Sequence, residues 1–208
     1  MGLTSWWQCD GGTSVERGRA NNATVEPRPD WSFAADLGVV RTVSDRRGSS
    51  GAAMTSELGG YLELEGDEDL AREVGYYVLR KMERSAFEDL SPPERVIACL
   101  TEIEMEVNNG GFNQYYWNSP GDHSLEAVAA LKELGAQHTA ALLTEANAAF
   151  GSGGPDSDRE RRWAQMKALG ESASAKWGEL DGAFYEYKDD LSKLAARYIR
   201  SNRLEFTD

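Results

Sequence analysis

The chain has 208 residues, a length typical of one domain with an extension or of one large domain, and 40% of its residues are hydrophobic. Lys and Arg number 22 against 35 Asp and Glu, so the formal net charge is −13. Such a surface repels phosphates, which excludes direct nucleic-acid binding as the expected function. A basic partner is the natural electrostatic complement, although acidity by itself also keeps a protein soluble.

The sequence shows no sign of export or of a membrane. Its two cysteines, Cys9 and Cys99, are too few and too far apart for a disulfide framework, which indicates a reducing compartment. No apolar run approaches the length of a membrane span. The N-terminus lacks the basic start and apolar stretch of a secretory signal. We therefore expect a cytoplasmic protein without membrane contact.

Two regions of different composition divide the chain. Residues 1–56 are rich in Gly, Ser, Thr, Asn, Arg and Pro without a regular period, which predicts a disordered N-terminal extension. Arginines and acidic residues balance in residues 1–53, so the net charge belongs to the part that begins at Met54. Met54 is also a candidate for the true translation start. Residues 57–208 are expected to form an acidic all-helical domain.

Apolar residues at helical spacing predict helices in the first part of this domain. A helix is expected from Asp67 to near Phe87. The run Ser91–Glu94 combines a capping box with proline at the first helical position, and this predicts the start of a second helix. Asn108–Gly111 tolerates positive φ and predicts that the second helix stops there, before a short helix over Phe112–Asn118.

The rest of the domain is also expected to be helical. The predicted segments run from Asp122 or Ser124 to Gly135, over Ala136–Phe150 and Arg159–Leu169, around Trp177–Tyr187 and over Asp189–Asn202. No run alternates cleanly enough to predict a strand. The expected fold class is all-α, a compact bundle of about six or seven helices joined by short loops.

No motif for a cofactor, a metal or a catalytic site is complete. The only histidines, His123 and His138, are fifteen residues apart, whereas metal-binding histidines usually form closely spaced pairs. Asn108–Gly111 has neither the preceding strand nor the ending of a phosphate loop. We therefore expect no metal, cofactor or catalytic residue, and interpret the chain as a non-enzymatic protein.

Carboxylates give the most suggestive pattern. Side chains four residues apart on a helix lie about 5–6 Å from each other, and one DNA strand carries a phosphate about every 3.4 Å. Helical rows of carboxylates can therefore approximate the charge density of DNA, although an ordinary solvated acidic face shows the same pattern. The residues expected to bind a partner are Glu63, Glu65, Asp67, Glu68, Asp69, Glu73, Glu102 and Glu106.

The segment from Glu106 to Asn118, EVNNGGFNQYYWN, looks like the signature of a bacterial helical domain family whose named member is a DNA-mimic protein. Leu180–Tyr185, with Tyr198 and Ile199, is similar to that family's C-terminal pattern, so the resemblance extends over roughly Leu90–Phe206. The resemblance implies an acidic all-helical protein. It also implies a partner of the kind that the named member binds, which is the DNA-binding surface of a transcriptional regulator.

Alternatives to DNA mimicry remain open. The family motif could line a small-ligand or enzymatic pocket, or it could be structural; its residues are Asn108, Asn109, Gly110, Gly111, Phe112, Gln114, Tyr115 and Asn118. The chain could also be an immunity protein against a basic toxin, and a homodimer is open. Two basic clusters would interrupt a mimic surface if they lay on its face, and they consist of Arg159, Arg161, Arg162, Arg197, Arg200 and Arg203.

Overall fold

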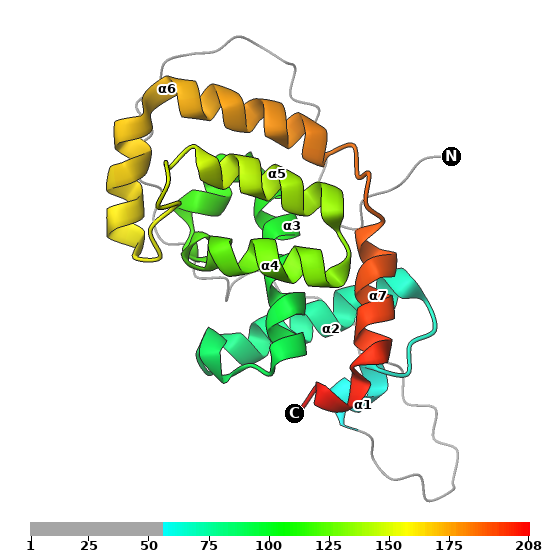
Figure 1. The fold of residues 1–208 in the computed structure, drawn as a ribbon. Helices are drawn as coiled ribbons and strands as arrows, with labels where there is room; N and C mark the ends of the chain where they lie inside the picture. The colour runs from blue at the N-terminus through cyan, green and yellow to red at the C-terminus, as the bar shows by residue number, and fades with distance from the viewer. Residues whose placement is uncertain (1–55) are drawn as a thin grey trace, which may run out of the picture. The chain divides into compact units, whose positions relative to one another are not determined.

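The computed structural model describes residues 56–208, and these residues form seven α-helices and no strand (Figure 1). The all-α prediction is therefore confirmed for this part of the chain. The predictions for the N-terminal extension, including the start at Met54, lie outside the described residues. The helices are α1 (Glu57–Tyr61), α2 (Asp67–Met82), α3 (Pro92–Trp117), α4 (Ser124–Leu134), α5 (Gln137–Ala148), α6 (Arg159–Phe184) and α7 (Leu191–Ser201).

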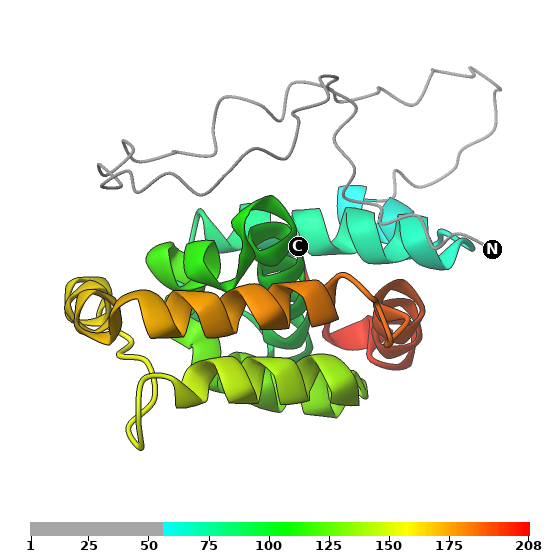
Figure 2. The same cartoon turned by 90° about the horizontal axis from the view of Figure 1, so that it is seen from above.

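Helix α3 is the interior element of the fold. It packs against α2, α4 and α6 and against the 3-10 turn η3 (Ser119–His123), so that α2 lies on one side of it and α4 and α5 on the other (Figure 2). Every residue from Val96 to Glu104 is buried. A helix that is enclosed all round must bury even its polar positions, and α3 carries several acids into the protein interior.

Helix starts follow the local sequence closely. The Ser91 hydroxyl accepts a hydrogen bond from the Glu94 backbone N–H at 3.3 Å, and the Glu94 carboxylate accepts one from the Ser91 N–H at 2.9 Å, which is the predicted capping box. Helix α2 begins with three acidic residues in its first turn and ends earlier than predicted, at Met82. Phe87 belongs instead to the separate 3-10 turn η2 (Phe87–Asp89).

Glycines break both long helices. The predicted stop at Asn108–Gly111 appears as a kink inside α3, where Gly110 and Gly111 leave helical geometry and Gly111 has φ 74°. The hydrogen-bond ladder resumes after it, so the predicted short helix is the second limb of α3. Helix α6 likewise joins two predicted segments across Gly170, which has φ 67°. Left-handed backbone favours glycine at both sites.

Helix α7 runs along α2 and brings the end of the chain beside the start of the helical domain (Figure 1). Its buried face contains Leu191, Ala195, Ala196 and Ile199. None of the described helices has the length and apolar character needed to cross a membrane.

Candidate functional site

The acidic segment that opens α2 is largely paired with arginines. Arg203 bonds the Glu63 carboxylate, and Arg200 lies 2.5 Å from an Asp67 oxygen. Arg72 contacts Asp69 at 2.5 Å and Glu73 at 3.1 Å. Two of the six predicted carboxylates in this segment form no ion pair with a described residue, and these are Glu65 and Glu68.

The two arginines from the end of the chain lie on the same face as the predicted acidic row. Arg200 is on α7, and Arg203 opens the 3-10 turn η4 (Arg203–Glu205). Besides their ion pairs, they donate to the backbone oxygens of Glu65 at 2.7 Å and Leu62 at 3.1 Å. The six predicted carboxylates of residues 63–73 thus lie beside three arginines, Arg72, Arg200 and Arg203. This segment of the surface keeps an excess of three negative charges. The surface is acidic but is interrupted by basic groups.

Glu102 and Glu106 do not lie on that surface. Their exposed fractions are 8% and 4%, because α3 is the interior helix and is packed against α2, α4, α6 and η3. The structure therefore corrects the expectation that both residues contribute to an exposed acidic row. They lie one helical turn apart, as the spacing predicted, but inside the protein.

Burial changes the chemistry of both carboxylates. Glu106 Oε2 accepts hydrogen bonds from Gln114 Nε2 and Asn118 Nδ2, each at 2.8 Å. Burial raises the pKa of Glu106, and these two bonds oppose the shift. No described residue donates a hydrogen bond to Glu102. Burial, with the negative charges of Glu106 and Asp122, raises the Glu102 pKa to about 8.

The glycine kink of the family motif is held by the end of α6. The Phe112 N–H donates to Asp181 Oδ1 at 2.8 Å, and the Tyr185 hydroxyl donates to the Val107 carbonyl at 2.8 Å. A Cβ on Gly111 would overlap the Asp181 carboxylate. The kink therefore frees backbone groups that α6 satisfies, and only glycine leaves room for this contact.

Other members of the motif also have structural partners. Asn108 Nδ2 donates to the Tyr187 hydroxyl at 2.6 Å. Phe112 and Tyr115 are buried in the core, whereas Asn109 and Gly110 are exposed. These contacts give Asn108, Gly111 and Phe112 a structural role, whereas Gln114 and Asn118 of the same motif bind the Glu106 carboxylate.

Arg162 was not predicted as a buried residue, and it is completely enclosed. Its guanidinium contacts Asp122 Oδ1 at 2.5 Å and donates to the carbonyls of Tyr116 at 2.7 Å, Asn118 at 3.0 Å and Asp156 at 2.7 Å. It thereby joins the end of α3, η3 and the loop before α6. This role could not be read from the sequence, because Arg162 stands beside Arg159 and Arg161 in a polar run and neither of these is buried.

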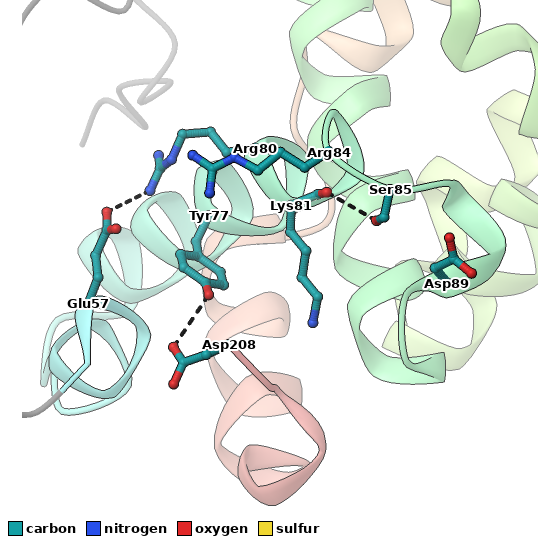
Figure 3. Close-up of a pocket in the computed structure, with 8 residues that line it drawn as sticks. All are labelled: Glu57, Tyr77, Arg80, Lys81, Arg84, Ser85, Asp89 and Asp208. Carbon is teal, nitrogen blue, oxygen red and sulfur yellow. Dashed lines mark hydrogen bonds and ion pairs between the residues drawn. The ribbon is translucent and has the colours of Figure 1, made fainter.

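A cleft of about 310 Å³ lies between the end of α2, α1 and the C-terminal residues (Figure 3). Arg80 forms an ion pair with Glu57 at 2.8 Å across its rim. Lys81 is bonded at 2.9 Å to the buried Glu94 and also to Thr207, so its charge is already matched. The lining is completed by Tyr77, Arg84, Ser85, Asp89 and Asp208. Three basic and three acidic residues line the cleft, which gives it no preference for one sign of ligand charge.

The two histidines occupy unrelated places. His123 stacks on Phe87 with ring centroids 3.9 Å apart, while His138 is on α5. Within residues 56–208 there is no group of three or more His, Cys, Asp or Glu side chains that could hold a metal ion.

Comparison with known proteins identifies the family of the helical domain. A family model described as DMP19-like protein matches residues 88–202, which is more than half of the chain. The match contains the glycine motif, Arg162 and α7, and it leaves α1 and α2 outside. Comparison with curated proteins and with solved structures gave no match.

Proposed function

Because the chain belongs to the DMP19-like protein family, we propose that it is an acidic interaction protein that binds a basic DNA-binding partner in place of DNA. The observation that carries this proposal is the charge of the helical part. Residues 56–208 contain 29 acidic and 16 basic residues, so the whole excess of 13 negative charges belongs to the helical domain and its loops. A partner that binds phosphates would be attracted to this field.

The start of α2 is the part of the surface best suited to such a partner. Glu65 and Glu68 are exposed and lack ion pairs to described residues, and they stand within the segment that keeps an excess of three negative charges. The surrounding ion pairs link α2 to α7 and fix the direction of this surface. The support comes from charge and exposure, since residues 63–73 lie outside the family match.

The proposal is tested by capturing the partner from cells that express the chain naturally. The immobilised full chain is incubated with lysate at low salt, the retained protein is identified, and its dissociation constant is measured at several salt concentrations. We expect affinity to fall steeply with salt and duplex DNA to displace the chain from the partner. A partner that duplex DNA cannot displace would refute mimicry. The identity of the partner separates a transcriptional regulator from a basic toxin.

Matched variants locate the contact surface. The double substitution Glu65→Gln and Glu68→Gln removes two exposed charges from the proposed surface. Glu160→Gln with Glu171→Gln removes two exposed charges from α6 and changes the net charge equally. We expect the first pair to weaken partner binding more than the second. Equal losses would mean that only net charge matters and that α2 is not the contact surface.

A further inference from the structure

Two buried carboxylates on α3 have incomplete hydrogen bonding. Glu102 is more than nine-tenths buried, and no described residue donates a hydrogen bond to it. Glu106 receives two hydrogen bonds, but both reach Oε2, so Oε1 has no donor within the described part of the chain. A buried carboxylate without donors is strongly unfavourable. The unbonded oxygens are not completely shut off from solvent, but their low exposure favours either a proton or a positively charged group on the pair.

No arginine or lysine of the described residues pairs with Glu102 or Glu106. On α3 itself, Cys99 and Tyr115 lie close enough to interact with Glu102 electrostatically. Asp122 of η3 adds a third carboxylate, and its own charge is matched by Arg162 of α6 at 2.5 Å, with Arg159 at 3.9 Å. From α4, Glu126 acts on Cys99 and adds further negative charge, while Arg95 of α3 weakly opposes it. Once Glu102 loses its proton, the two carboxylates have no cationic partner among the described residues.

The pair lies close to the surface. Gln114 and Asn118, which hold Glu106, are partly exposed, and the Asp122 side chain is 29% exposed. Glu102 keeps 8% of its surface open. Because the Glu102 oxygens and Glu106 Oε1 are not completely buried, a small group can reach them from solvent beside this polar rim.

We propose that Glu102 and Glu106 form the floor of a site for one organic cation, an ammonium or guanidinium group whose N–H donors bond the free carboxylate oxygens. Such groups satisfy carboxylate acceptors with only two anionic partners. A hard metal ion needs six or more oxygen ligands, and the described residues hold no metal-binding group. The same cationic chemistry is offered by a free polyamine and by the arginine side chain of a partner protein.

Proton release accompanies binding at this site. At neutral pH Glu102 holds a proton, because its pKa is raised to about 8. The cation replaces that proton, so its affinity should increase up to about tenfold per pH unit as the pH rises toward 8 and should level off above it. Simple electrostatic attraction to an exposed acidic surface would show no such dependence in this range.

The test uses the full chain and the side-chain amide NMR signals of Gln114 and Asn118, whose NH2 groups report on Glu106. Methylguanidinium is titrated to about 50 mM, which covers weak millimolar binding. Tetramethylammonium, which has no N–H donor, is added at equal ionic strength as the control. We expect saturable shifts with methylguanidinium only. Spermidine and a blocked arginine residue are then compared, and the tighter of the two identifies the source of the cation.

The substitution Glu102→Gln completes the test, since the amide has the shape of the protonated acid and should preserve the fold. Saturable shifts should disappear in this variant and persist in Glu171→Gln. The proposal is overturned if the two amide signals do not respond, if they respond equally to tetramethylammonium, or if Glu102→Gln binds like the original chain. These results are independent of partner capture, so this site and the proposed function can fail separately.

Discussion

Asp181 accepts the backbone N–H of Phe112 at 2.8 Å, and this hydrogen bond attaches the second limb of α6 to the glycine kink of α3. The kink would otherwise leave the Phe112 N–H without the acceptor that a continuous helix provides. A carboxylate is a stronger acceptor than the lost carbonyl, so the contact compensates for the interrupted helix. The family motif thus fixes how two long helices meet.

Removal of the Asp181 carboxylate should destabilise the fold. Asp181→Ala leaves the Phe112 N–H without its acceptor, and we expect the free energy of unfolding to fall by about 1–3 kcal/mol. Asp181→Asn keeps an acceptor oxygen and should cost less. Chemical denaturation of both variants measures the difference. Glu179→Ala on the exposed side of the same helix is the control, and a loss as large as that of Asp181→Ala would contradict this role.

Gly111 should tolerate no side chain. Gly111→Ala places a Cβ against the Asp181 carboxylate in a left-handed backbone conformation, and both effects are unfavourable. We expect a loss of about 2 kcal/mol or more. Gly178→Ala in α6 has open space around the new Cβ and should stabilise the protein by up to about 1 kcal/mol. Thermal unfolding compares the two, and a neutral Gly111→Ala would show that the kink rearranges freely.

The substitution Glu102→Gln should change the pH dependence of stability. The native pKa of about 8 lies above the usual 4.5, so the folded protein binds more protons than the unfolded chain between these values. The original protein therefore loses stability as pH rises through this window, by up to about 1.4 kcal/mol per unit. Glu102→Gln lacks this loss. Its melting temperature should match that of the original below about pH 4.5, exceed it increasingly up to about pH 8 and stay above it by a constant amount at higher pH. A difference that does not change across this window would exclude this explanation.

Removal of the arginines that face α2 should strengthen partner binding. Arg200→Gln with Arg203→Gln exposes the carboxylates of Asp67 and Glu63, and we expect affinity for the captured basic partner to rise a few-fold, since exposed pairs are worth about 0–1 kcal/mol each. Lys167→Gln with Lys188→Gln makes the same change in net charge elsewhere. Titration calorimetry on both pairs measures the effect. Weaker binding after the arginine substitutions would place the contact away from α2.

The helices could be predicted from the sequence because their signals are local. Ser91 and Glu94 form the predicted capping box, and Gly135 ends α4 in left-handed geometry as its position indicated. The position of the break at Asn108–Gly111 was predicted correctly. The sequence did not show that the helix resumes as part of α3, because the backbone after the kink is held by Asp181 from a distant segment. Local pattern cannot reveal such a partner.

The candidate site was less predictable for the same reason. Glu102 and Glu106 have the residue type of a solvated face, and only the packing of α3 inside the fold buries them. The ion pair between Asp67 and Arg200 joins the start and the end of the helical domain. From the sequence we could say only that Arg200 would interrupt the acidic surface if it lay on the same face. The buried Arg162 lies in the same polar run as Arg159 and Arg161, which are not buried, so the residue type does not distinguish it. The sequence gives the number of charged side chains, but it does not show which of them pair with each other in the folded protein.

Gly170 divides α6 into two segments that are anchored to different parts of the fold. The limb before it is anchored to the end of α3 by Arg162 and by Trp163, whose ring nitrogen donates to the Trp117 carbonyl at 2.8 Å. The limb after it is anchored to α5 through Trp177 and to the α3 kink through Asp181. An added Cβ at Gly170 would meet nothing. Loosening of one limb is therefore poorly transmitted to the other, and backbone amide exchange should divide α6 into two independently opening segments at this glycine.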